Sequence, residues 1–143
     1  ARNPNLLVAG SPPALWLIDH GAALYFHHNW DAVDEARARA PFAPIRDHVL
    51  LPIAGDLDAA DARLADRLSP EAIAGILAAI PDALFMDAPE GRTAPFESAD
   101  ANREAYGRFF RQRLAAPRAW VQAAREAQQA LSDTDDAPLP YRR

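Results

Sequence analysis

Two side chains that could bind a cation flank a pair of short apolar runs near the start of the chain. Asn5 opens the first run, residues 5–9, and Asp19 directly follows the second, residues 14–18. If the runs pair as antiparallel strands, these ends lie side by side, so the amide oxygen of Asn5 and the carboxylate of Asp19 can bind one ion. Mg²⁺ that carries nucleotide phosphates is held in this way, with water and phosphate as its other ligands. The alternative is that both residues only shape turns, as Asn and Asp commonly do.

The element that must position these two residues is a β-hairpin over residues 5–18. Gly10-Ser11-Pro12-Pro13 lies between the two runs, and its prolines favour a loop of more than two residues. Asp19-His20-Gly21 ends the second run, where glycine can adopt the backbone angles that a sharp exit needs. A hairpin at the start of the chain is therefore expected.

From residue 31 onward the apolar residues recur at helical spacing, which predicts a mainly helical body over 31–131. The fold class is therefore α+β, and the acidic, then proline-rich residues 132–143 are expected to form a flexible tail. Ser69-Pro70-Glu71 is a strong helix start, and Ser98 is a second candidate N-cap. The predicted helices cover 31–40, a segment from Pro41 or Pro44 to about Pro52, then 56–68, 70–80, 98–114 and 117–131.

Each predicted helix carries an apolar face that should point into the core. Phe109, Phe110 and Trp120 are interpreted as core rather than as a cofactor pocket, because they recur at helical spacing. The residues expected to face inward are Ile45, Val49, Leu50, Ile53, Leu57, Leu64, Leu68, Ile73, Ile76, Leu77, Ile80, Tyr106, Phe109, Phe110, Leu114, Trp120, Val121, Ala124 and Leu131.

Composition excludes several classes of function. The 143 residues carry a net charge of −5 without a long basic run, which disfavours nucleic-acid binding. No apolar run approaches the roughly 20 residues of a membrane span, and no signal-peptide pattern is present. Cysteine is absent, which fits a cytoplasmic location, and all 15 basic residues are arginine. Without lysine, the chain cannot supply the lysine that binds phosphate in many phosphotransferases.

The first 30 residues resemble a known family. Asn3-Pro4-Asn5-Leu6-Leu7, followed by the string from Leu15 to His28 with Ile18-Asp19-His20-Gly21 at its centre, is similar to the bacterial HipA-like kinases. These proteins are related in fold to the phosphatidylinositol and protein kinases. The helical remainder is compatible with such a kinase but carries no motif of the family.

The resemblance implies a role for each residue of the hairpin ends. Asp19 would be the metal-binding aspartate, and Asn5 would be the catalytic-loop asparagine, with Asn3 as its rival. The implied cofactors are Mg²⁺ and ATP. Leu7 and Ile18 would contact the adenine ring, although both can equally be ordinary core residues.

The chain departs from the family pattern in what it lacks. The catalytic-loop aspartate, the glycine-rich loop and the phosphate-binding lysine are not in the sequence, which begins on Ala1 without methionine. We therefore expect residues 1–131 to be the C-terminal part of a kinase domain whose N-terminal lobe lies elsewhere in a longer protein. The isolated chain should neither hold ATP tightly nor transfer a phosphoryl group, and the phosphoryl acceptor is unknown.

Three alternatives compete with the kinase interpretation. His20, His27 and His28 with Asp19 and Asp31 could form a transition-metal cluster, although their spacing matches no recognised ligand motif. The adjacent Asp47 and His48 are similar to the pair in HD-type phosphohydrolases, which need further ligands on other helices. Finally, the chain could be a non-catalytic helical interaction module that retains a kinase-like hairpin.

Overall fold

The two apolar runs at the start of the chain form the predicted hairpin. In the computed structural model, which describes residues 5–20, 23–24, 26, 29–87 and 94–133, strand β1 (Leu6–Ala9) pairs antiparallel with β2 (Ala14–Leu17). Leu6 lies opposite Leu17 and Ala9 opposite Ala14. Gly10 begins the loop at φ +97°, a backbone conformation that glycine adopts without steric cost.

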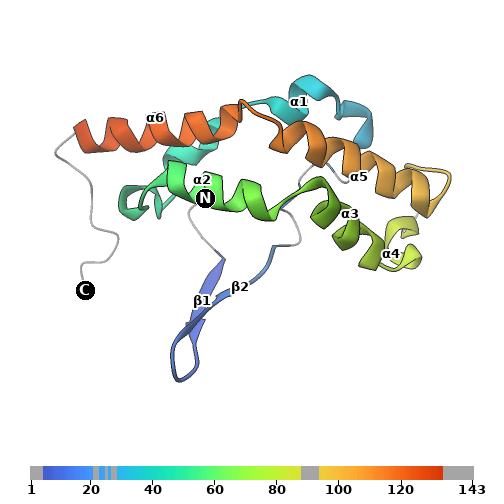
Figure 1. The fold of residues 1–143 in the computed structure, drawn as a ribbon, viewed down its shortest axis with the longest axis horizontal. Coiled ribbons are helices and arrows are strands. Elements are labelled where there is room, and N and C mark those ends of the chain that lie inside the picture. The colour runs from blue at the N-terminus through green and yellow to red at the C-terminus, as the bar shows by residue number, and fades with distance from the viewer. Residues whose placement is uncertain (1–4, 21–22, 25, 27–28, 88–93, 134–143) are drawn as a thin grey trace.

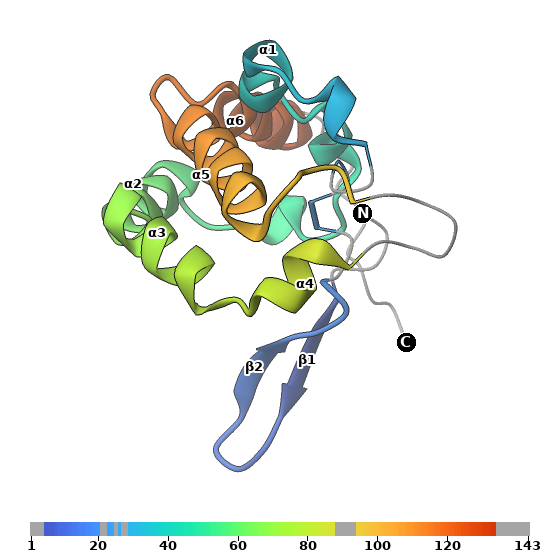
Figure 2. The same ribbon diagram turned by 90° about the vertical axis from the view of Figure 1, so that its right-hand side faces the viewer.

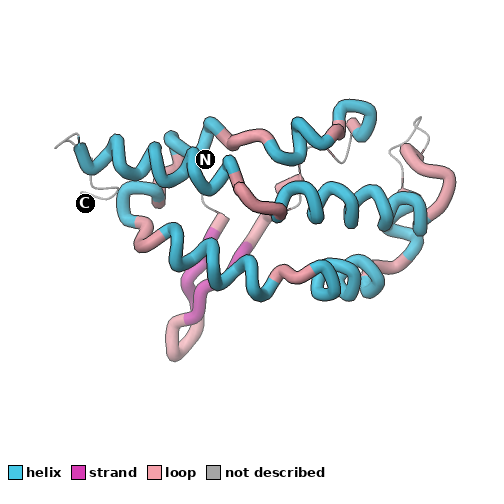
Figure 3. Tube along the Cα trace, turned by 45° about the horizontal axis from the view of Figure 1, so that its top comes forward, coloured by secondary structure: helices cyan, strands magenta, loops and turns pink. Residues whose placement is uncertain are grey.

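The helices form two rows that run in opposite directions (Figures 1 and 3). One row consists of α2, α3 and α4, and the chain then returns through α5 and α6, while α1 contacts α5 from the other side. The hairpin projects away from these rows (Figure 2). The α-helices are α1 (Glu35–Arg39), α2 (Leu57–Arg67), α3 (Pro70–Ala79), α4 (Asp82–Met86), α5 (Ala99–Leu114) and α6 (Ala119–Asp133). The fold class is thus α+β with a mainly helical body, as predicted.

Local capping explains where most of these helices begin. Asp56 caps α2, and its side chain accepts a hydrogen bond from the backbone N–H of Ala59 at 2.9 Å. Ser69 caps α3 and Ser98 caps α5 in the same way, as the sequence predicted. These bonds satisfy backbone donors that the first helical turn leaves without an intrahelical partner.

The core lies where α5 meets its neighbours. One cluster of buried side chains joins α3 and α4 to the start of α5, and a second joins α1 to Phe109 of α5 through Phe26. The half-buried Tyr106 and Phe110 contact both clusters. Burying this apolar surface is the main force that holds the rows together. The first cluster consists of Ile73, Leu77, Phe85 and Ala99.

Hydrogen bonds and ion pairs of one arginine hold the turn between α3 and α4 against α5. Arg103 of α5 donates to the carbonyl of Ile80 at 2.8 Å and to that of Leu77 at 3.3 Å. The same guanidinium binds the carboxylates of Asp82 and Asp100. It therefore supplies hydrogen bonds to carbonyls at the C-terminal end of α3, where the carbonyl of Leu77 also accepts one from the backbone N–H of Ile80.

Several predicted helices are wrong in extent or type. The segment 31–40 contains only α1, preceded by a 3-10 helix at Trp30–Ala32. The helix expected after Pro41 is instead two short 3-10 helices, Ala43–Asp47 and Leu51–Ile53, because Pro44 and Pro52 have no N–H to continue an α-helix. The short helix α4 was not predicted.

Three residues predicted to face inward are exposed. Ile53 is 61% exposed, Leu64 is 52% exposed and Ile76 is 55% exposed. The predicted tail 132–143 starts too early, because α6 continues to Asp133; residues 134–143 lie outside the described residues. None of the described helices has the length and apolar character needed to cross a membrane.

Candidate functional site

The open end of the hairpin brings Asn5 and Asp19 together. The backbone N–H of Ile18 donates to the carbonyl of Asn5 at 2.9 Å, which extends the strand pairing by one residue. The side-chain Nδ2 of Asn5 then donates to the backbone carbonyl of Asp19 at 2.8 Å. The two predicted metal ligands are therefore neighbours in space although they are 14 residues apart in sequence.

Both residues also adopt an unusual backbone conformation. Asn5 and Asp19 each have φ of +52°, in the left-handed region that non-glycine residues rarely occupy. Asn and Asp tolerate this region better than other side chains because their short polar groups can hydrogen-bond locally. Such backbone conformations are often found at functional sites, where the surrounding structure maintains them. Substitution by a β-branched residue at either position would be strained.

The pair can supply only part of a metal-ion coordination sphere. Within the described residues, no group of three or more His, Cys, Asp or Glu side chains is placed to hold a metal ion. A Mg²⁺ ion bound here would use one oxygen from each side chain and take its other ligands from water or phosphate.

The residues predicted to contact adenine lie beside the pair on one face of the hairpin. Leu7 is opposite Trp16 in the strand pairing, and Ile18 follows two residues after Trp16, so the three side chains share a face. Leu7 is 50% exposed and Ile18 is 44% exposed. Neither is therefore an ordinary core residue in this structure, and both are accessible to a ligand.

The other residues that the sequence suggested as metal ligands do not form a site among the described residues. Asn3, His27 and His28 lie outside the described residues, and the exposed His20 and Asp31 form no metal-binding group with the other described residues. The Nδ1 of His48 accepts a hydrogen bond from the backbone N–H of Leu50 at 3.2 Å, which gives this imidazole a local structural role. The described residues therefore offer no ligand set for an HD-type phosphohydrolase site.

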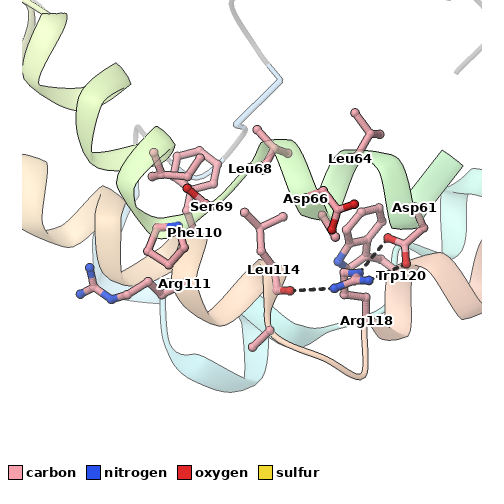
Figure 4. A pocket seen from close by; sticks show the side chains of 14 residues that line it. Asp61, Leu64, Asp66, Leu68, Ser69, Phe110, Arg111, Leu114, Arg118 and Trp120 are labelled. Atoms are coloured by element: carbon pink, nitrogen blue, oxygen red, sulfur yellow. Dashed lines mark hydrogen bonds and ion pairs between the residues drawn. The ribbon is translucent and has the colours of Figure 1, made fainter.

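A cavity between the two helix rows was not predicted from the sequence (Figure 4). It measures about 590 Å³ and lies between α2–α3 and the junction of α5 with α6. Phe110 and Trp120, which the sequence assigned to the core, are half-buried and line this cavity. Helical spacing predicts that a residue points inward, but it carries no information on whether a partner fills the space it points into.

An ion pair forms one end of this cavity. The guanidinium of Arg118 donates to both carboxylate oxygens of Asp61, at 2.7 and 2.6 Å, and also to the carbonyl of Leu114 at 3.1 Å (Figure 4). Only 18% of the Arg118 side chain and 19% of the Asp61 side chain are exposed. These contacts with Asp61 raise the pKa of Arg118 above its ordinary value. A bidentate pair of this kind fixes the geometry of both groups.

The chain matches no protein-family model, no curated protein and no solved structure.

Proposed function

We propose that this chain is the C-terminal part of a HipA-like, ATP- and Mg²⁺-dependent kinase and that it supplies two of the metal ligands. The observation that carries the proposal is the contact between Asn5 and Asp19 at the open end of the hairpin, with both residues in the left-handed conformation. The resemblance of the surrounding sequence to this kinase family supports the same roles.

In this proposal each residue has a distinct task. The carboxylate of Asp19 binds Mg²⁺, which bridges the phosphates of ATP and offsets the charge that develops during transfer. The amide oxygen of Asn5 is the second protein ligand, and Leu7 and Ile18 contact the adenine ring. The phosphate-binding lysine comes from the N-terminal lobe of the cytoplasmic full-length protein, because this chain contains no lysine. The catalytic aspartate belongs to the catalytic loop of that protein, in a part outside this chain.

The decisive experiment compares two Asp→Asn variants in the full-length protein that contains this chain. Asp19→Asn should lower Mg²⁺-dependent phosphoryl transfer from ATP by at least about 10–100-fold, the loss seen when even an outer partner of a metal site is removed. Asp47→Asn is the matched control, since Asp47 is exposed and only 3.8 Å from Arg46 in a surface ion pair. Full activity of Asp19→Asn, or an equal loss in both variants, would contradict the proposal.

A second measurement does not depend on activity. In the full-length protein with bound ADP, Mn²⁺ should broaden the NMR signals of the residues around Asn5 and Asp19, because a paramagnetic ion relaxes nearby nuclei. Asp19→Asn should abolish this broadening. Broadening centred on another acidic group would place the metal site elsewhere.

One observation favours the non-catalytic alternative. The hairpin has no charged residue from Asn5 to Ile18, and all its large apolar side chains except that of Leu6 are between 44% and 71% exposed. A surface of this kind suits a protein–protein contact. Saturable Mg²⁺–ATP binding by the full-length protein, lost in Asn5→Ala, would argue strongly against this alternative.

A further inference from the structure

The cavity beneath α2, here called the α2 cavity, is the feature of the fold that the proposed kinase function does not use. Its walls are mainly apolar and include Ile73, Phe110, Leu114 and Trp120. Helix α2, which has no fully buried residue, lies along one side of it. At about 590 Å³ the cavity is within the usual size range of small-molecule sites.

The formal charges of the side chains that line the α2 cavity sum to zero. Its ionisable lining residues are two acids, Asp61 and Asp66, and two bases, Arg111 and Arg118. Asp61 and Arg118 already satisfy each other through two hydrogen bonds, and separating them would leave a poorly solvated charge without a partner. Asp66 and Arg111 are exposed, and water screens them. A charged ligand would therefore find no unneutralised counter-charge inside.

The aromatic side chains indicate what shape of ligand fits. Phe110 and Trp120 are both half-buried and both line the cavity. The indole of Trp120 is held in place, because its Nε1 donates to the carbonyl of Arg113 at 3.1 Å and the Arg113 guanidinium lies 5.2 Å from its ring centroid. A fixed aromatic wall favours contact with a flat ring.

We propose that the α2 cavity is a binding site for a small, uncharged molecule that carries an aromatic ring. The ring occupies the apolar space lined by Phe110, Leu114 and Trp120, and the Asp61–Arg118 pair lies at one end (Figure 4). Binding does not involve Mg²⁺ or the hairpin, so this site is independent of the proposed kinase function.

Two fluorescent probes with the same rings test the chemistry. N-phenyl-1-naphthylamine is uncharged, whereas 8-anilino-1-naphthalenesulfonate carries a sulfonate. The chain should bind the uncharged probe saturably, with a dissociation constant at least about ten-fold lower than that of the sulfonate, because burying an unpaired charge is unfavourable. Equal binding of the two probes, or tighter binding of the sulfonate, would overturn the proposal.

Matched substitutions on α2 test the location. Ala65→Phe places a ring inside the cavity and should weaken binding of the uncharged probe about ten-fold or more, whereas Ala62→Phe on the exposed side of the same helix should not. If Ala65→Phe loses helicity, the unsubstituted chain still decides the question by intermolecular NOEs. The naphthyl protons should show NOEs to the methyl groups of Leu68, Ile73 and Leu114. NOEs only to hairpin methyl groups would overturn the assignment.

Discussion

At the scale of single residues, the most informative positions combine an uncommon backbone conformation with a specific contact. Asn5 and Asp19 are such a pair, and their side-chain types are what made them visible in the sequence. His48 is a different case. Its role follows from its burial and its hydrogen bond with Leu50, and not from the Asp47–His48 motif. Burial lowers the pKa of His48 below its ordinary value of 6.5. The hydrogen bond from Leu50 to its Nδ1 also requires the neutral ring.

This lowered pKa predicts how stability depends on pH. The folded state binds a proton at His48 less readily than the unfolded state, so the stabilisation is complete above pH 6.5 and is lost as the pH falls towards the lowered folded pKa. The free energy of unfolding of the unsubstituted chain should therefore decrease between about pH 7 and pH 5.5. His48→Gln should remove most of this decrease when denaturant unfolding is measured across the range. His20→Gln, at an exposed position, should retain it.

At the scale of elements, capping residues determine where helices start. Ser98 accepts a hydrogen bond from the backbone N–H of Ala101 at 3.1 Å, at the start of the helix that forms the centre of the core. Ser98→Ala should lower the free energy of unfolding by about 1 kcal/mol, the usual cost of removing an N-cap. Ser132→Ala is the control, because its hydroxyl lies at the exposed end of α6. Equal losses from both substitutions, measured by urea unfolding, would contradict the capping role.

The hairpin is the element whose stability depends least on the rest of the described chain. A two-stranded hairpin is only marginally stable in water, and β1 and β2 make their main contacts with each other while the hairpin projects away from the helix rows (Figure 2). Amide hydrogens of Val8 and Leu15 should therefore exchange much faster than those of Tyr106 and Phe109 in α5. Hydrogen-exchange NMR provides the measurement. Protection of the hairpin equal to that of α5 would mean that the strands are covered by another surface.

At the scale of the whole molecule, polar links hold the two helix rows in register. Asp61 of α2 pairs with Arg118, which directly precedes α6, and Asp58 of α2 pairs with Arg125 of α6. Gln128 of α6 donates to the carbonyl of Ala54 at 2.7 Å. The order of these contacts shows that α2 and α6 are antiparallel. Because the partners come from distant parts of the chain, these links form only when the rows meet.

A double-mutant cycle tests the contribution of the Asp61–Arg118 pair. Asp61→Ala and Arg118→Ala should each lower the free energy of unfolding, and the double variant should lose less than the sum because the second substitution removes a group that is already unpaired. We expect a coupling energy of about 1–2 kcal/mol, which is above the value for exposed pairs but is reduced by partial solvent access. The same cycle at the more exposed Asp58 and Arg125 should give a smaller coupling.

The sequence by itself determined the features that depend on neighbours a few residues away. The hairpin followed from two apolar runs and a Gly-Ser-Pro-Pro turn, and the starts of α3 and α5 followed from Ser69 and Ser98. The contact between Asn5 and Asp19 was also predictable, since antiparallel pairing brings together the outer ends of adjacent strands. All these interactions form within one element or between consecutive strands.

Only the tertiary structure decided which apolar faces are covered. Leu64 and Ile76 are on apolar faces but remain exposed, whereas Trp120 and Phe110 line a cavity, although Phe110 also packs against both core clusters. The ion-pair partner of Arg118 could not be predicted from the sequence either, because Asp61 is 57 residues away and no local pattern connects them. Burial and ion pairing depend on what the opposite element presents, and that is established only when the two rows of helices come together.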